Sequence, residues 1–172
     1  PTSMQLFLNN TEGNVEYLRD SIANITAKLN VTGKTIFLTS NMSGFGTLTN
    51  TTVIYNTTNL TKVGTFNITA YFPGDQNFSS SSQTYFAIVL GPYLEMKLIE
   101  PTGLKLVREG EKFLLNANIT CKRLGCGNVN ATARFEDNVI NTTGILFVNE
   151  SVIKSCFLNV NDFCLVNWTV FT

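Results

Sequence analysis

The fold is decided by the stretch Asn24-Ile25-Thr26-Ala27-Lys28-Leu29-Asn30-Val31-Thr32. Apolar residues occupy every second position, and the positions between them hold Asn, Thr or Lys. Successive side chains of a β-strand point to opposite faces, so this alternation predicts a strand with one face in a core and the other in water.

The same alternation recurs along the whole chain, and turn signals separate the runs. It is found at 66–72, 115–121, 129–135 and 164–170. The turn signals are Gly33-Lys34, Gly44-Phe45-Gly46, Pro73-Gly74-Asp75 and Gly125-Cys126-Gly127. Many short strands joined by regular turns predict an all-β sandwich or barrel. In the last run the pattern points Cys164, Val166, Trp168 and Val170 inward, so Trp168 is expected in the core.

A boundary is expected at Leu90-Gly91-Pro92-Tyr93, because all four cysteines lie after it. Each part is close in length to one immunoglobulin-like sandwich, which has about seven strands. We therefore expect two tandem immunoglobulin-like β-sandwiches, one at 1–91 without Cys and one at 92–172 with two short-range disulfides.

The four cysteines are Cys121, Cys126, Cys156 and Cys164, and they allow three connectivities. Pairing between sequence neighbours is favoured, and each bond would close a short loop and contribute roughly 2–3 kcal/mol. The alternative is a zinc site. The spacings of four and seven intervening residues differ from the usual two, and a secreted chain matures in an oxidising compartment, so disulfides are preferred.

Fourteen asparagines stand in the pattern Asn-x-Ser/Thr, the acceptor sequon for N-linked glycan. With 21 Asn and 33 Ser or Thr in 172 residues, chance placement would give roughly four. This excess indicates an exposed surface on a secreted chain, although a Thr- and Asn-rich strand surface would create some sequons fortuitously. The candidate acceptors are Asn9, Asn24, Asn30, Asn41, Asn50, Asn56, Asn59, Asn67, Asn77, Asn118, Asn130, Asn141, Asn149 and Asn167.

Composition argues against several classes of function. Twelve basic residues balance twelve acidic ones, with no basic stripe that would indicate nucleic acid. No apolar run is long enough to span a membrane. The absence of histidine removes the commonest general base and metal ligand, so no catalytic site, metal or cofactor is expected. We expect the chain to be a segment of a longer secreted precursor.

Two sets of loop residues could bind a ligand or act in catalysis. Asp75 and Asn77 could ligate Ca²⁺, but the preferred interpretation is that the Asp75 side chain accepts hydrogen bonds from the backbone of its own turn. Four carboxylates could act as the paired acids of a glycosidase, but the preferred interpretation is that they are charged side chains on solvent-exposed loops. These carboxylates are Glu109, Glu111, Glu136 and Asp137.

Both parts of the chain resemble known surface modules. The run 64–78 places a Gly before an apolar-polar strand and then a Gly-Asp turn, and a Ser-rich segment and a final strand follow. In this it resembles the immunoglobulin-like repeats of large bacterial and archaeal surface proteins. The runs 118–121, 126–133, 156–164 and 166–170 resemble a cysteine-containing domain of surface proteins in small-genome archaea. The second resemblance implies disulfides Cys121–Cys126 and Cys156–Cys164 and a place on the cell surface.

The second part is expected to lack its last strand. By role, Cys164–Phe171 is expected to correspond to Thr65–Phe72, the penultimate strand of the first part. The first part then has a closing strand at Thr84–Val89, and the second part has none before Thr172. We expect that strand either to follow Thr172 or to be donated by another chain, as in donor-strand complementation.

Together these features predict a structural and adhesive segment of a heavily N-glycosylated extracellular filament, stalk or surface layer. Its expected partners are N-linked glycans and further copies of itself, and another cell surface is a further candidate partner. The alternative is an adhesin or receptor ectodomain that binds a partner cell through its end loops. The sequon-free basic loop Lys122-Arg123-Leu124 is the candidate there. A viral surface glycoprotein also fits the sequon density.

Overall fold

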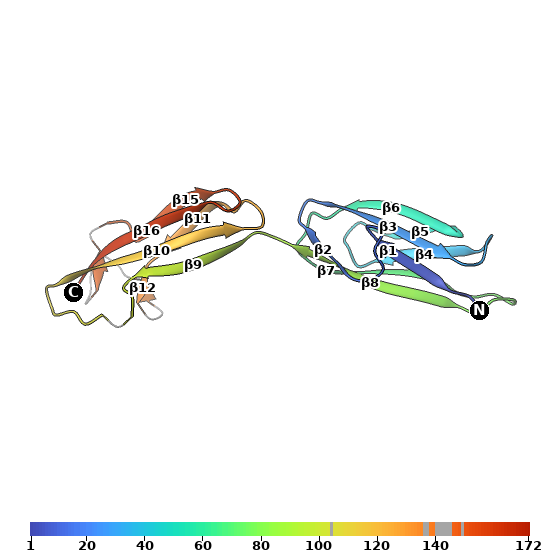
Figure 1. Ribbon diagram of the computed structural model, residues 1–172, viewed down its shortest axis with the longest axis horizontal. Coiled ribbons are helices and arrows are strands. Elements are labelled where there is room, and N and C mark those ends of the chain that lie inside the picture. The colour runs from blue at the N-terminus through green and yellow to red at the C-terminus, as the bar shows by residue number, and fades with distance from the viewer. Residues whose placement is uncertain (104, 136–137, 140–145, 149) are drawn as a thin grey trace. The chain divides into compact units, whose positions relative to one another are not determined.

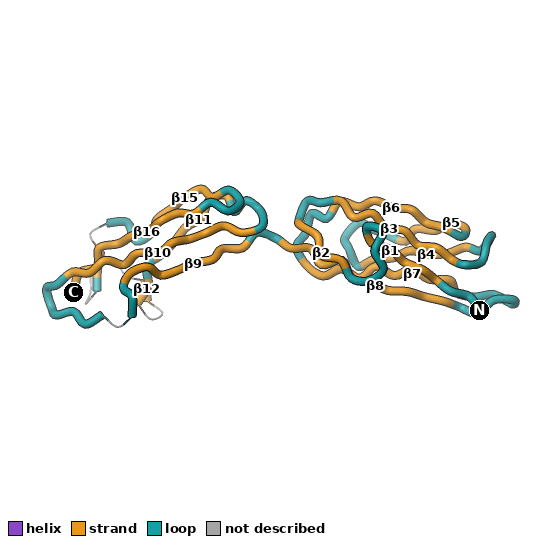
Figure 2. Tube along the Cα trace, viewed as in Figure 1, coloured by secondary structure: helices purple, strands orange, loops and turns teal. Residues whose placement is uncertain are grey.

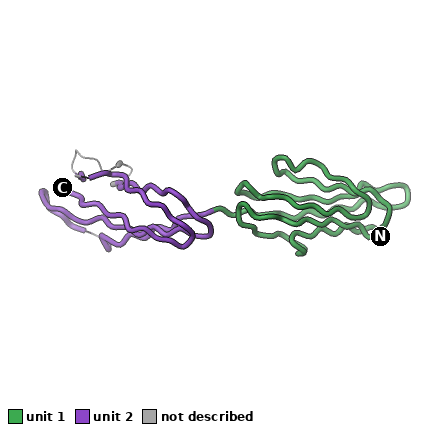
Figure 3. Tube along the Cα trace, turned by 90° about the horizontal axis from the view of Figure 1, so that it is seen from above, with its two compact units in different colours: residues 1–91 green, residues 92–172 purple. Residues whose placement is uncertain are grey.

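The computed structural model describes residues 1–103, 105–135, 138–139, 146–148 and 150–172. Its fold class is all-β: the chain consists of strands joined by turns and loops (Figure 2). It divides into two compact units, residues 1–91 and 92–172 (Figure 3). In these ranges no helix is long and apolar enough to cross a membrane.

Unit 1 is an immunoglobulin-like sandwich of two sheets (Figure 1). One sheet has the strand order β1-β3-β6 and the other has the order β2-β8-β7-β4-β5. All pairs are antiparallel except β2 with β8, which is parallel. The strands are β1 (Met4–Leu8), β2 (Val15–Leu18), β3 (Ile22–Leu29), β4 (Thr35–Ser40), β5 (Thr47–Thr51), β6 (Val53–Asn59), β7 (Gly64–Phe72) and β8 (Ser81–Leu90).

The core of unit 1 is built by the period-two alternation. On β3, Ala23, Ile25, Ala27 and Leu29 are buried, whereas Asn24 and Lys28 between them are exposed. The inner residues of the neighbouring β1 are buried as well, at 6% or less exposure. They are Met4, Leu6 and Leu8, which lie opposite Leu29, Ala27 and Ile25 of β3.

Unit 2 contains a four-stranded sheet in the order β14-β16-β10-β9 and a two-stranded sheet of β11 with β15. The described residues of unit 2 also form a short hairpin of β12 with β13, and all of these strand pairs are antiparallel. The strands are β9 (Tyr93–Glu100), β10 (Lys112–Lys122), β11 (Gly127–Thr132), β12 (Arg134–Phe135), β13 (Asn138–Val139), β14 (Phe147–Val148), β15 (Ile153–Leu158) and β16 (Phe163–Phe171).

Trp168 lies in the core of unit 2 and is 3% exposed. Its indole Nε1 donates a hydrogen bond to the carbonyl of Ser151 at 3.1 Å, so the polar atom of the ring is satisfied. Val166 and Val170 on the same face of β16 are also buried. The tryptophan therefore joins β16 to the segment that leads into β15.

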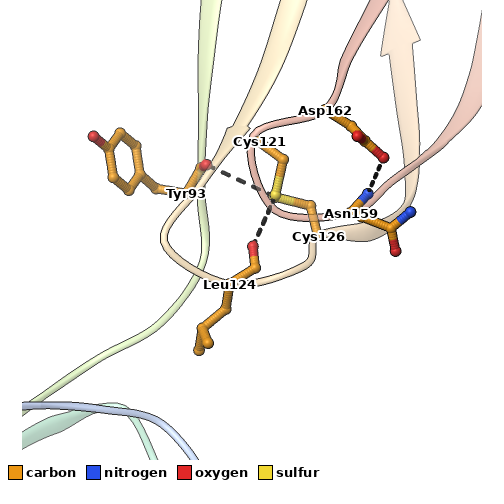
Figure 4. The surroundings of a disulfide bond; sticks show 6 residues. All are labelled: Tyr93, Cys121, Leu124, Cys126, Asn159 and Asp162. Carbon is orange, nitrogen blue, oxygen red and sulfur yellow. Dashed lines mark hydrogen bonds between the residues drawn. A yellow bond between two sulfur atoms is a disulfide. The ribbon is translucent and has the colours of Figure 1, made fainter.

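Both disulfides join cysteines that are neighbours in sequence: Cys121–Cys126 and Cys156–Cys164. The first closes the turn between β10 and β11, with a Cα–Cα distance of 5.9 Å (Figure 4). Backbone bonds tie it to the turn between β15 and β16: Asn161 N donates to the Cys121 carbonyl and Cys121 N donates to the Asp162 carbonyl. Two disulfides indicate maturation in an oxidising compartment.

The pairing of β16 corrects the role expected for Cys164–Phe171. β16 pairs with β10 in unit 2, just as β6 pairs with β3 in unit 1. By the same comparison β9 corresponds to β1, and β11 with β15 corresponds to β4 with β5. Cys164–Phe171 is therefore the counterpart of Val53–Asn59, and the equivalence with Thr65–Phe72 is wrong. Alternation shows which side chains face the core but not which strand is the neighbour, so the two roles look alike in sequence.

Strand β11 consequently has one open edge within the described ranges. In unit 1, β4 pairs with β5 on one side and with β7 on the other. In the part of unit 2 that the structure describes, β11 pairs with β15 alone. Counterparts of both β7 and β8, rather than of one closing strand, are missing from these residues.

Candidate functional site

The acceptor asparagines lie on accessible surface wherever the structure describes them. Nine are exposed and three are half-buried, and none of these twelve is buried. Asn141 and Asn149 fall outside the described residues. The half-buried ones are Asn56, Asn67 and Asn118, and the exposed ones are Asn9, Asn24, Asn30, Asn41, Asn50, Asn59, Asn77, Asn130 and Asn167.

Several of these carboxamides are held in place through the side-chain oxygen. Asn41 and Asn67 form a reciprocal pair, in which each backbone N–H donates to the other residue's Oδ1 at 2.9 Å. The Oδ1 of Asn9 accepts from the backbone of Asn24, and the Oδ1 of Asn130 accepts from the Ser155 hydroxyl. Glycan is attached at Nδ2, so a bond to Oδ1 fixes the side chain and leaves the attachment atom available.

Two acceptors differ from this arrangement. Asn30 accepts from Ser3 N through Oδ1, and its Nδ2 also donates to the Pro1 carbonyl at 3.0 Å. Asn118 lies between Lys97 and Leu165 on the outer face of the four-stranded sheet, and its Oδ1 is buried without a hydrogen-bond partner. Among the twelve described acceptors, these two are the ones at which local packing competes most directly with an attached sugar.

A second surface is the inner face of β9, which the sequence analysis missed. Leu94, Met96 and Leu98 lie opposite Cys121, Ile119 and Ala117 of β10, so all six side chains point toward the core side of the sheet. The three residues of β10 are at most 5% exposed, whereas those of β9 are 46%, 74% and 51% exposed. Within the described residues nothing covers this apolar row.

The equivalent row of unit 1 shows what normally covers such a face. Met4, Leu6 and Leu8 of β1 are buried, and Met4 N donates a hydrogen bond to Ser81 Oγ of β8. Strand β8 belongs to the opposite sheet, so it closes the sandwich over β1. Since unit 2 has no described counterpart of β8, the row Leu94-Met96-Leu98 stays open to solvent.

The basic loop Lys122-Arg123-Leu124 is stapled by the first disulfide and packs on β9. The Arg123 guanidinium carbon lies 4.9 Å from the centre of the Tyr93 ring, and Lys122 Nζ lies 3.6 Å from a Glu95 carboxylate oxygen. In Figure 4 Leu124 lies at the tip of the turn, and its carbonyl oxygen is 2.9 Å from Cys121 Sγ. Arg123 has a φ of 73°, so the turn holds a conformation that few side chains adopt.

Asp75 stabilises its own turn and an ion pair. Its Oδ1 accepts hydrogen bonds from the backbone N–H groups of Asn77 and Phe78, and its Oδ2 lies 2.7 Å from Lys34 Nζ. The hydrogen bond from Lys34, followed by that from Asn77, lowers the pKa of the Asp75 carboxyl. In the described residues no three acidic or cysteine side chains gather as a metal site.

The carboxylates considered for glycosidase chemistry do not form a site in the described residues. Glu111 accepts a hydrogen bond from Arg108 N in the loop before β10, and Glu136 and Asp137 fall outside the described residues.

No protein-family model matches the chain, and no curated protein matches it in sequence. Among solved structures, it is similar to the titin domains Z1Z2 in complex with telethonin, with 11% identity and a TM-score of 0.38 over 96% of this chain and 93% of that one. It is also similar to a chimeric titin Z1Z2-Z1Z2 tandem, with 12% identity and a TM-score of 0.34 over 98% and 96%.

A third similar structure is Salmonella alpha-2-macroglobulin reacted with methylamine, with 10% identity and a TM-score of 0.36. The match covers 99% of this chain but only 14% of that protein.

Proposed function

We propose that this chain is a structural segment of a heavily N-glycosylated extracellular filament, stalk or surface layer. The observation that carries the proposal is the set of acceptors on accessible surface, several of them with the carboxamide oxygen already bonded to the protein. Sugar at these positions would supply the solvation that a chain with 14% charged residues otherwise lacks.

The two sandwiches suit a mechanical role. Each unit has its own core. In unit 2, Cys156–Cys164 joins β15 of the two-stranded sheet to β16 of the four-stranded sheet, and Cys121–Cys126 joins the end of β10 to the turn before β11. The resemblance to immunoglobulin-like repeats of bacterial and archaeal surface proteins supports the same role and a place on the cell surface. Self-association would give such a segment its place in an extended assembly.

Glycosylation also gives a physical reason for the location of the sequons. Several strands at sheet edges carry an acceptor: β5 has Asn50, β6 has Asn56 and Asn59, and β11 has Asn130. An exposed edge presents unpaired backbone groups to other chains, and a bulky glycan beside it hinders such pairing. The sugar would therefore prevent unwanted association at these edges while leaving other surfaces free.

Mass spectrometry of intact glycopeptides from the secreted chain tests this function. The proposal expects glycan on at least half of the fourteen acceptors, with the exposed ones occupied first. Asn10 and Asn14, which are asparagines outside the sequon pattern, serve as internal controls and should carry none. Occupancy of four or fewer sites in a host that glycosylates other secreted proteins would contradict the proposal.

A second candidate function is recognition of a partner cell through the loop Lys122-Arg123-Leu124. The observation that favours it is the stacking of Arg123 on Tyr93 beside a disulfide, which presents a rigid basic surface without a sequon. Binding of the chain to whole cells, compared with an Arg123→Ala and Lys122→Ala variant, tests it. Unchanged cell binding by the variant would assign any adhesion to another surface.

A further inference from the structure

Strand β9 is self-complementary along its free edge. Its central residues are Leu94-Glu95-Met96-Lys97-Leu98, and among the described residues β9 is the last strand of its sheet. If a second copy runs antiparallel with Met96 opposite Met96, then Leu94 lies opposite Leu98 and Glu95 lies opposite Lys97. We propose that two copies of this chain pair in this register along β9, about a two-fold axis that passes between the two Met96 residues.

The apolar side of this pair would join the two open rows of β9 into one continuous row. Leu94, Met96 and Leu98 from both copies would stand side by side, with directly opposed Cβ atoms about 4.5–5.5 Å apart. These are the same side chains that are 46%, 74% and 51% exposed in the single chain. A two-fold interface brings the same patch of both subunits together, so the apolar row of one copy would contact the apolar row of the other.

The charged side of the pair is matched as well. Glu95 and Lys97 lie on the outer face of β9, and the register gives two Glu95–Lys97 pairs across the axis. Within the described part of the chain, Lys97 has no ion-pair partner. Glu95 has a long ion pair with Lys122 at 3.6 Å and accepts a hydrogen bond from the Tyr93 hydroxyl at 3.4 Å. A shift of the register by two residues would remove both the matched charges and the central methionine pair.

The distribution of sequons supports a protein contact at this edge. Strand β9 spans eight residues and carries no acceptor, and neither do the shorter edge strands β1, β2 and β15, whereas β5, β6 and β11 each carry at least one. The interval from Asn77 to Asn118 is the longest stretch of the sequence without a sequon. A glycan on this edge would block strand pairing, so its absence leaves β9 accessible to another copy.

This inference deepens the proposed function and rests on it in one respect, namely that the segment self-associates outside the cell. The two ideas fail separately. Acceptors without sugar would contradict the proposed function and leave the β9 contact intact. Occupied acceptors on a chain that does not pair through β9 would overturn this inference alone.

Cysteine cross-linking of the full secreted chain tests the register. We expect Met96→Cys to form a disulfide-linked dimer under mild oxidation, because the two residues face each other across the axis. Leu94→Cys alone should not cross-link, because its two copies would lie about 14 Å apart, well beyond disulfide reach. A mixture of Leu94→Cys with Leu98→Cys should cross-link. The control is Tyr55→Cys on the edge strand β6, where the native residue is 78% exposed.

Equal cross-linking of Met96→Cys and Tyr55→Cys would mean random collision and would overturn the proposal. So would the absence of any dimer with Met96→Cys, or a dimer of Leu94→Cys alone that matches the mixture. Each variant is first checked for a folded unit 2 by the fluorescence of the buried Trp168.

A charge exchange gives an independent test. Glu95→Lys or Lys97→Glu places like charges opposite each other and should weaken dimerisation roughly tenfold, measured by sedimentation velocity. The double variant Glu95→Lys with Lys97→Glu restores opposite charges and should recover the dimer. Lys122→Glu removes the contact with Glu95 inside the chain and should leave dimerisation nearly unchanged. No recovery in the double variant would overturn the proposed register.

Discussion

Met96 of β9 and Ile119 of β10 lie directly opposite each other in an antiparallel pair, but Met96 is 74% exposed and Ile119 is only 4% exposed. Both side chains point to the same side of the sheet, so the difference comes from what lies above them. The sheet of β11 with β15 provides the opposite layer of unit 2, but within the described residues no strand continues that layer over β9.

The first prediction compares this row with its counterpart in unit 1. Met96→Ala should change the unfolding free energy of the single chain by less than about 0.5 kcal/mol, because the side chain is largely in water. Leu6→Ala, at the equivalent place in β1, should lose about 2–5 kcal/mol because it leaves a cavity in a closed core. Urea denaturation at a concentration where the chain is monomeric measures both. Similar losses at the two positions would show that the face of β9 is covered within one chain.

The second prediction concerns the disulfide between Cys121 and Cys126. Replacing both by Ala should destabilise unit 2 by about 2–3 kcal/mol, because the bond restricts the unfolded chain. Trp168 is the only tryptophan and is buried in unit 2, so its fluorescence follows the unfolding of this unit. The matched control replaces Cys156 and Cys164 in the same way and should give a loss of similar size. A variant with unchanged stability would show that the bond does not restrain the unfolded chain.

Much of the fold was predictable from alternation, because a period of two is a local property of strands. The all-β class and the immunoglobulin-like sandwiches follow from runs such as 24–32 and 164–170. Strand partners are not local, and for this reason the role assigned to Cys164–Phe171 was wrong. Its face was predictable, but its neighbour β10 lies some fifty residues earlier in the chain.

The open face of β9 was missed for a related reason. Leu94, Met96 and Leu98 have the same alternation as any half-buried strand, and exposure depends on a covering strand that the pattern does not reveal. Two signals in the sequence could have indicated it. One is the long interval without a sequon between Asn77 and Asn118, and the other is the symmetric order of charges at Glu95 and Lys97.

The third prediction separates the sugar on Asn41 from the role of its side chain. Ser43→Ala removes the sequon but leaves the reciprocal bonds between Asn41 and Asn67, so the glycan should disappear with little change in the stability of the unglycosylated protein. Asn41→Ala removes the sequon and also one of the two bonds, the one that Asn41 Oδ1 accepts. It should cost about 1 kcal/mol more, because the backbone N–H of Asn67 loses its partner. Glycopeptide mass spectrometry and thermal unfolding measure the two effects. Equal stability of the two variants would show that the pair contributes nothing to the fold.

The fourth prediction concerns pH. The hydrogen bonds from Lys34 and from Asn77 N lower the pKa of Asp75 below its unfolded value of about 3.9. A carboxyl with a lowered pKa in the folded state adds stability above its unfolded pKa, and this is lost as the pH falls through the folded value. Carbon-detected NMR titration of the side chain should show the low pKa, and Lys34→Met should raise it. The control Arg19→Met should leave it unchanged, and a pKa that is insensitive to Lys34 would contradict the assignment.

Cryo-electron microscopy of the native assembly would show both the glycans and the contact between copies. We expect copies of this chain in a regular array, with branched density at the exposed acceptors such as Asn24 and Asn167. We also expect two β9 strands paired antiparallel with Met96 at the axis. Unpaired β9 strands in a bare, monomeric particle without density at these asparagines would contradict both the glycosylated structural role and the contact between copies.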